Sequence, residues 1–159
     1  MDRRTFLATS LMGSVVASIG SAASAAERYF PVKVDQSLFD TINRVKIPGK
    51  TTPLEMSHAP AITAPKTVKA GELFVVEVSV GENVHVMGPV HWIEYIELAI
   101  GNEPVGRVEF QPRGFMKPKV TFTLALPKDL APSGIVTLVA SQRCNLHGLW
   151  ESTLDIAVG

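Results

Sequence analysis

The chain has few of the residues that most often build metal and redox sites. Among its 159 residues there are one cysteine and four histidines. A single cysteine cannot form an internal disulfide, so no disulfide framework stabilises the fold, whatever the compartment. The chain also has no excess of charge of one sign, because fifteen basic residues offset fifteen acidic ones and neither sign forms a run. This balance argues against nucleic acid or an anionic membrane surface as the main partner, since both require a basic face.

A hydrophobic run long enough for a permanent membrane span is absent from the start of the chain. The apolar run from Phe6 to about Ile19 is short and rich in glycine, serine and alanine, so we expect no permanent span. It follows the pair Arg3-Arg4 and is followed by small residues. This is the three-part layout of an export signal.

The start of that signal resembles the twin-arginine type, because Arg3-Arg4 is followed directly by a Thr-Phe-Leu step. We expect residues 1–26 to be this signal, with cleavage after Ala25 or Ala26, and a periplasmic location for the mature protein. The twin-arginine route carries folded proteins. It would therefore allow a metal to be loaded in the cytoplasm, before copper and zinc compete for the site.

The rest of the chain predicts a single all-β domain. Residues 27–56 show weak periodicity and indicate an irregular arm, with one helical turn around residues 37–43. Residues 57–159 contain short, alternating, β-branched runs separated by glycine, proline and asparagine. We interpret them as an immunoglobulin-like antiparallel β-sandwich of about seven strands. The runs are 73–80, 91–100, 105–110, 119–126, 135–142 and 152–158.

The histidines and the cysteine fall in a restricted set of places. Cys144 and His147 are three residues apart, a step that can bring both side chains onto one metal ion. Taken alone, such a pair is more often a buried thiol beside a surface histidine. His58, His85 and His91 also lie in expected loops or at strand ends, where the edges of a sandwich converge. The spacing therefore favours one shared metal site over scattered surface histidines.

Three segments of the sequence closely resemble the iron-binding domain of superoxide reductases, the neelaredoxin and desulfoferrodoxin family. They read HVMGPVHWIEYIEL, VGRVEF and CNLHGLWES, and the resemblance extends from about Glu55 to the C-terminus. It implies a sandwich with one mononuclear non-haem iron, held by four histidine nitrogens in a plane and an axial cysteine thiolate. The matching positions are His58, His85, His91 and His147 for the plane and Cys144 for the axis.

The resemblance also implies a reaction. Superoxide is reduced by one electron to hydrogen peroxide, the iron is oxidised, and an external redox protein returns the electron. A thiolate opposite the open position assists product release in this reaction, so Cys144 is also expected to be catalytic. We further expect a homo-oligomer.

The chain departs from the family pattern beside the first histidine. The family has a Glu-Lys pair directly before the position of His58, whereas this chain has Met56 and Ser57, with Glu55 one place further back. The family's lysine is thought to attract superoxide and its glutamate to reach the iron. Glu55 and Ser57 are therefore the candidates for these catalytic roles, although Ser57 carries no charge.

Three smaller features complete the comparison with the family. Lys50, Lys66 or Lys69 are candidates to replace the missing lysine in space. Val86 stands where the family has a proline, which changes loop stiffness and removes no ligand. The N-terminal cysteines of desulfoferrodoxins are absent, so no second iron centre is expected.

Two other functions fit parts of the pattern. A copper electron carrier of cupredoxin type also has a Cys…His pair near its C-terminus, but it normally adds a methionine beyond the last histidine. No methionine follows His147. The loss of the family's charged pair at Met56 and Ser57 favours a second alternative, an iron-binding or sensory module of the same fold without efficient turnover.

Overall fold

The computed structural model describes residues 34–113 and 116–159. The predicted export signal and the first residues of the arm lie outside this range. The described residues form nine strands and very little helix, which confirms the all-β prediction. The longer strands are β4 (Leu73–Val80), β5 (Ile93–Ile100), β6 (Glu103–Glu109), β7 (Lys119–Ala125), β8 (Ile135–Cys144) and β9 (Gly148–Val158). All six coincide with the predicted runs to within a few residues.

The nine strands exceed the predicted number of about seven, and three short ones match none of the six predicted runs. They are β1 (Ile42–Asn43), β2 (Pro60–Thr63) and β3 (Thr67–Val68). Segments of two to four residues are too short to show an alternating pattern, so sequence periodicity does not find them. β1 and β3 also pair with β9 in the parallel direction, whereas the longer strands pair antiparallel as predicted.

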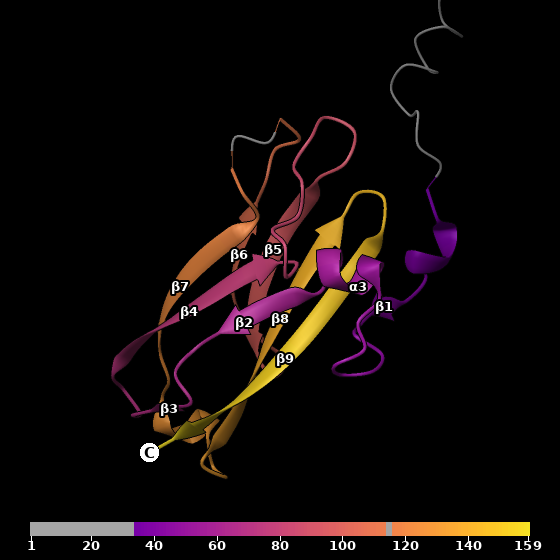
Figure 1. Cartoon of the computed structure of the whole chain (residues 1–159). Helices are drawn as coiled ribbons and strands as arrows, with labels where there is room; N and C mark the ends of the chain where they lie inside the picture. Colours follow the sequence, from indigo (N-terminus) through magenta and orange to yellow (C-terminus); the bar gives the residue numbers. More distant parts are fainter. Residues whose placement is uncertain (1–33, 114–115) are drawn as a thin grey trace, which may run out of the picture. The chain divides into compact units, whose positions relative to one another are not determined.

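The strands form two sheets that face one another. One has the order β1-β9-β8-β5-β6, with β3 also paired to β9, and the other has the order β2-β4-β7 (Figure 1). Alternate residues of β4 and β8 are buried, as expected for strands that turn one face to a core. The core lies between the sheets and includes Val76, Val78, Leu98 and Leu138.

The arm is more regular than predicted. It contains a 3₁₀ turn at Gln36–Leu38, the strand β1, and most of a short helix, α3 (Pro53–His58), which crosses the predicted boundary at residue 57. Asn43 ties the arm to the larger sheet, because its amide nitrogen donates to Leu38 O at 2.8 Å and to Leu149 O at 2.9 Å.

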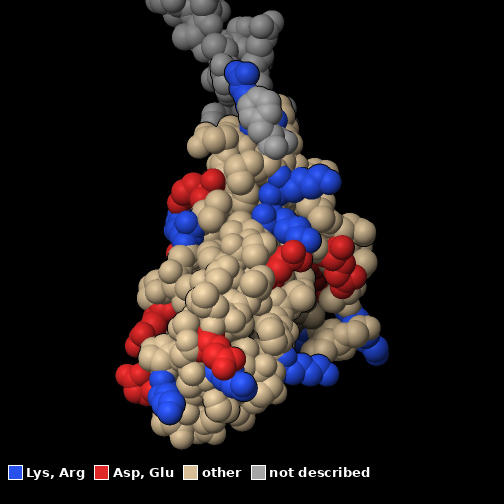
Figure 2. Space-filling model, turned by 90° about the vertical axis from the view of Figure 1, so that its left-hand side faces the viewer, with Lys and Arg blue, Asp and Glu red and all other residues tan. Residues whose placement is uncertain are grey.

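The outer surface carries charges of both signs. On the face shown in Figure 2, lysine and arginine side chains lie interspersed with aspartate and glutamate.

Within residues 34–113 and 116–159, no helix has the length and apolar character that crossing a membrane requires.

Candidate metal centre

The five predicted ligands come from four places that meet at one end of the sandwich. His58 ends α3, His85 and His91 lie in the loop between β4 and β5, Cys144 ends β8, and His147 lies in the turn before β9. These segments gather at the upper end of the fold in Figure 1. Residues separated by up to 89 positions thus become neighbours, because each lies at or near the end of an element that reaches this edge.

The helix that carries His58 is held by a capping box. Thr52 accepts a hydrogen bond from the Glu55 backbone, the Glu55 side chain accepts one from the Thr52 backbone, and Pro53 occupies the first turn. His58 Nδ1 lies 2.9 Å from Leu54 O, one turn back. A carbonyl can only accept, so Nδ1 carries the proton and Nε2 is left with a free lone pair for a metal.

The loop with His85 is fixed against the end of this helix. Gly81 N donates to Ala59 O at 3.1 Å and Glu82 N donates to Met56 O at 2.8 Å. Gly81 has a φ of +81°, and a Cβ there would meet a backbone oxygen at 2.6 Å, so only glycine fits this approach. The loop consequently turns back and places His85 beside His58.

Asn145 joins His91 to the cysteine-bearing turn. Its Oδ1 accepts from Trp92 N at 2.9 Å, and its Nδ2 donates to Val90 O at 3.0 Å. Asn145 follows Cys144 and the two backbone partners flank His91. One side chain therefore sets the distance between these two predicted ligands.

Trp150 lies against two of the histidines. Its Nε1 donates to His147 O at 2.8 Å, and its ring is stacked on the His58 ring with centroids 5.5 Å apart. The side chain is buried, with 3% of its surface exposed. Trp150 thus serves as a wall of the site.

The four imidazole rings are arranged in a square. Each pair of neighbours meets edge to face, with centroids 4.5–4.8 Å apart and interplanar angles of 72–85°. His58 and His91 lie across the square, 5.8 Å apart and nearly parallel at 25°. The order around the square is His58, His85, His91, His147.

The donor atoms converge on one point. His58 Nε2, His91 Nε2, His147 Nδ1 and Cys144 Sγ provide the group of metal-ligating side chains whose donor atoms lie within 4.8 Å of one another. His85 stands outside that group, yet its Nε2 is 3.2 Å from His58 Nε2 and 3.1 Å from His91 Nε2. Nitrogens so close, with one buried sulfur beside them, suit a borderline metal such as iron.

Burial keeps these histidines neutral, which is the form that binds metals. It lowers the pKa of His58 from 6.5 to about 3, against a smaller opposite effect of the hydrogen bond to Leu54. It lowers the pKa of His85 to about 4, with His91 as the next contributor. The pKa values of His91 and His147 are lowered by burial as well.

The cysteine is equally buried and its thiol holds its proton in the absence of a cation. Burial raises the pKa of Cys144 to about 11, although the backbone N–H groups of Leu146 and His147 are directed at the sulfur and act in the opposite direction. A bound cation reverses this balance because it favours the thiolate. Metal binding therefore releases a proton from Cys144.

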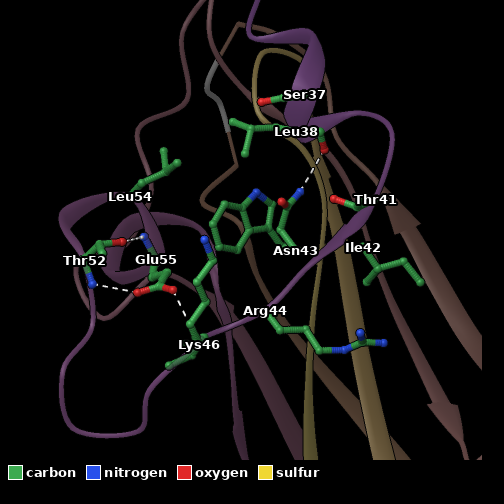
Figure 3. Close-up of a pocket in the computed structure, with 12 residues that line it drawn as sticks. Ser37, Leu38, Thr41, Ile42, Asn43, Arg44, Lys46, Thr52, Leu54 and Glu55 are labelled. Atoms are coloured by element: carbon green, nitrogen blue, oxygen red, sulfur yellow. Dashed lines mark hydrogen bonds between the residues drawn. The ribbon is translucent and has the colours of Figure 1, made fainter.

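Glu55 has a structural role that the sequence prediction did not give it. Its Oε2 accepts from Thr52 N at 2.7 Å and its Oε1 accepts from Lys46 N at 3.0 Å, as Figure 3 shows. These two hydrogen bonds are the main cause of its lowered pKa. The carboxylate thus caps α3 and joins the arm to it, and the predicted approach of Glu55 to the metal is not found in this structure.

Ser57 is closer to the centre than Glu55 and acts through His58. Its Oγ lies 2.8 Å from His58 Nδ1 and donates to Pro53 O at 3.0 Å or Leu54 O at 3.1 Å. The hydroxyl therefore supports the orientation of the His58 ring. It supplies no charge beside the site.

Two of the lysines considered as substitutes lie far from the cluster. Lys66 and Lys69 flank β3, which pairs with Ala157 and Val158 at the end of β9, whereas the metal cluster lies at the start of that strand. An eleven-residue strand is roughly 30 Å long, so neither ammonium group can replace a charge beside the metal.

A cavity of about 460 Å³ lies beside the cluster. It is lined by residues of the arm, α3 and Trp150, and Figure 3 shows how the side chains of Leu38, Leu54 and Asn43 line it. None of the five clustered ligands lines this cavity. Trp150, which lines the cavity, is stacked on His58 of the cluster.

Comparisons with known proteins agree with the geometry. The family model described as desulfoferrodoxin matches residues 50–153. A superoxide reductase of Pyrococcus horikoshii is 35% identical over 108 residues, which covers 62% of this chain and 86% of the relative. Neelaredoxin of Megalodesulfovibrio gigas is 33% identical over 119 residues, covering 64% of this chain and 87% of the relative.

The fold agrees with a solved structure as well. The superoxide reductase (neelaredoxin) from Ignicoccus hospitalis has a TM-score of 0.62 and 38% identity, and the match covers 80% of this chain and all of that one. A copper carrier of cupredoxin type is thereby set aside, because the matching family is an iron-binding one. The chain belongs to the desulfoferrodoxin family, and the cluster of His58, His91, Cys144 and His147 is its iron site.

Proposed function

We propose that this chain is a superoxide reductase, with His85 completing the iron site as a fifth ligand. The arrangement that carries the proposal is the square of four neutral imidazoles with one buried thiol beside it. Bound iron supplies the electron that converts superoxide, together with two protons, to hydrogen peroxide, and an external redox protein restores that electron. The named relatives support the same reaction.

The chain's own residues prepare the site for a small anion. Four neutral imidazoles and one thiolate leave a divalent ion with a formal charge near +1, which attracts an anionic substrate. His58 and His85 are buried, with 2% and 5% of their surfaces exposed, whereas His91 and His147 are partly exposed. Superoxide and solvent protons therefore approach from the side of His91 and His147.

The fixed ligand geometry limits the rearrangement needed when the charge at the site changes. Leu54 O orients His58, Asn145 ties His91 to the cysteine turn, and Trp150 holds the backbone of His147. Hydrogen bonds of this kind, one shell outside the metal, set ligand orientation and tune the metal. The N–H groups directed at Cys144 tune the basicity of the sulfur.

The test of the function is reaction with superoxide generated in pulses. We expect the iron-loaded, reduced protein to consume superoxide in a second-order reaction, with hydrogen peroxide as the product and no dioxygen. A second candidate function, an iron-binding or sensory module, is favoured by Met56 and Ser57 in place of the charged pair. Iron binding without consumption of superoxide would support that alternative and refute the enzyme.

Introducing the missing charge should accelerate the reaction. An ammonium group several ångströms from the metal, at an effective dielectric constant near 20, is worth roughly 1–2 kcal/mol to an approaching anion. We therefore expect Ser57→Lys to raise the second-order rate by about tenfold at low ionic strength, and the gain to shrink as salt is added. The measurement is pulse radiolysis across a salt series.

The matched control for this charge is Ser57→Met. It also removes the hydroxyl that contacts His58 Nδ1, but it adds length without charge. The ratio of the two variants' rates therefore isolates the ammonium group. Equal rates for the lysine and methionine variants at low salt would show that charge at position 57 does not steer superoxide.

We also propose that residues 1–26 export the folded, iron-loaded protein to the periplasm. Arg3-Arg4 followed by Thr-Phe-Leu supports the twin-arginine route. The double substitution Arg3→Lys and Arg4→Lys should leave the full-length precursor in the cytoplasm, still carrying iron, because two lysines keep the charge and lose the pair that the route requires. Fractionation with iron analysis checks this, and normal periplasmic accumulation of the double variant would contradict it.

We propose that another redox protein donates the electron to the iron and that the chain assembles into a homo-oligomer. The partly exposed edge at His91 and His147 is the place where the ligand shell is accessible to a donor.

A further inference from the structure

Gln142 is a buried polar residue on the strand that ends in the metal-binding cysteine. It has no exposed surface, and neither has Cys144, two positions further along β8. Residues two apart on a strand project from the same face. The amide of Gln142 and the sulfur of Cys144 therefore share the inward face of one strand.

Among the described residues, the Gln142 amide makes one hydrogen bond, to the backbone of the ligand His58. Gln142 Nε2 donates to His58 O at 2.8 Å. His58 is the last residue of α3, and the last carbonyls of a helix have no partner within the helix. Gln142 thus satisfies a buried carbonyl at the point where the chain leaves α3 and enters β2.

The amide oxygen of Gln142, Oε1, gains no hydrogen bond in this position, because no donor within the described part of the chain reaches it, although the atom is buried. An unpaired buried oxygen costs free energy. Methionine, of similar size, would remove that unpaired oxygen and leave His58 O unpaired instead, so the two effects on folding offset each other. What glutamine adds is a directional link between β8 and His58.

We propose that Gln142 is a positioning residue of the metal centre, which holds the backbone of His58 in a fixed place relative to Cys144. The link crosses from the larger sheet to the helix and spans 84 residues of sequence. The positioning role of Gln142 rests on the iron site and not on superoxide as the substrate. The positioning role and the superoxide reductase activity can therefore fail separately.

The test compares iron-loaded Gln142→Met with the wild type. The oxidised variant should show a shifted and broadened sulfur-to-iron charge-transfer band, because the angle between His58 and the sulfur is no longer fixed. Transfer of iron from the reduced, ferrous variant to the chelator ferrozine should be faster by roughly tenfold, the lower end of the range for residues one shell outside a metal. The unfolding midpoint of the metal-free protein should stay within about 4 °C of the wild type.

Leu138→Met is the matched control. Leu138 lies on the same inward face of β8 and is equally buried, but it is four residues from Gln142 and contacts no ligand by hydrogen bond. It should leave the band and the rate of iron transfer unchanged. Gln142→Asn, which keeps an amide but is one methylene too short, should change the iron site as Gln142→Met does.

Two outcomes would overturn the proposal. One is an unchanged band and unchanged iron transfer in both Gln142 variants. The other is an equal change in Leu138→Met, which would show that packing of β8, and not the hydrogen bond to His58, controls the site.

Discussion

Replacing Cys144 by serine is expected to abolish the sulfur-to-iron charge-transfer absorption of the oxidised protein. Cys144 is the only cysteine in the chain, and its sulfur lies 3.1 Å from His91 Nε2 and 3.4 Å from His147 Nδ1. A serine hydroxyl is far less acidic than a thiol and is a harder ligand, so it cannot supply the charge-transfer donor. We also expect iron affinity to fall by more than the roughly 10–100-fold caused by changes one shell further out.

The control for sulfur chemistry is Met87→Leu. The Met87 sulfur also lies near the centre, where it accepts from Ile93 N at 3.3 Å, but it is not in the cluster. This variant should keep the band. A band that persists in Cys144→Ser, or that disappears in Met87→Leu, would show that the sulfur ligand has been assigned to the wrong residue. Optical spectra of both oxidised variants at equal iron content decide between these results.

Acid is expected to destabilise the metal-free protein strongly between about pH 6.5 and pH 4. His58 and His85 have folded pKa values of about 3 and about 4, whereas an unfolded histidine titrates near 6.5. In this window the unfolded state binds protons that the folded state does not, so stability falls as the pH falls. At pH 5, about 1.5 pH units below the unfolded value, each histidine costs about 2 kcal/mol, or about 4 kcal/mol together.

Denaturant unfolding of the metal-free protein at pH 7.5 and pH 5 measures this loss. His85→Gln should reduce it by about 2 kcal/mol, because glutamine does not titrate. A free energy of unfolding that is equal at the two pH values would contradict the buried, neutral state of these rings. Bound iron should oppose the loss at first, since a ligand that binds only the folded state stabilises it, until protons displace the metal.

The long strands and the ligand set could be predicted from the sequence, for different reasons. In β4 and β8, buried residues alternate with exposed or partly exposed ones over eight and ten positions, a length at which periodicity is readable. The histidines could be placed because none interrupts such a run. Their spacing favoured one shared metal site, and the resemblance to a family implied iron and the set of five ligands. The structure then brought the same residues together.

The contacts around the ligands could not be predicted in the same way. Thr52, Pro53 and Glu55 carry the signature of a capping box, which would have revealed α3 and the capping hydrogen bonds of Glu55. Gln142, by contrast, looks like any polar residue in an alternating strand. Its partner lies 84 residues away, and only the packing of the two sheets brings them together.

The distance of the candidate lysines is a further result that sequence alone does not provide. Lys66 and Lys69 are close in sequence to the segment with His58, yet β2 carries the chain away from the centre before β3 begins. Only three-dimensional placement shows that these charges belong to the opposite end of the sandwich.

We propose that one iron, held by four histidines and Cys144, reduces superoxide. The most direct test of this reaction is a titration of the anaerobic, ferrous protein with known amounts of superoxide. Oxidation of the iron, hydrogen peroxide and dioxygen are measured together. We expect one iron to be oxidised and one hydrogen peroxide to form for each superoxide consumed, with no dioxygen. One dioxygen for every two superoxide ions, or superoxide that disappears without oxidising the iron, would contradict it.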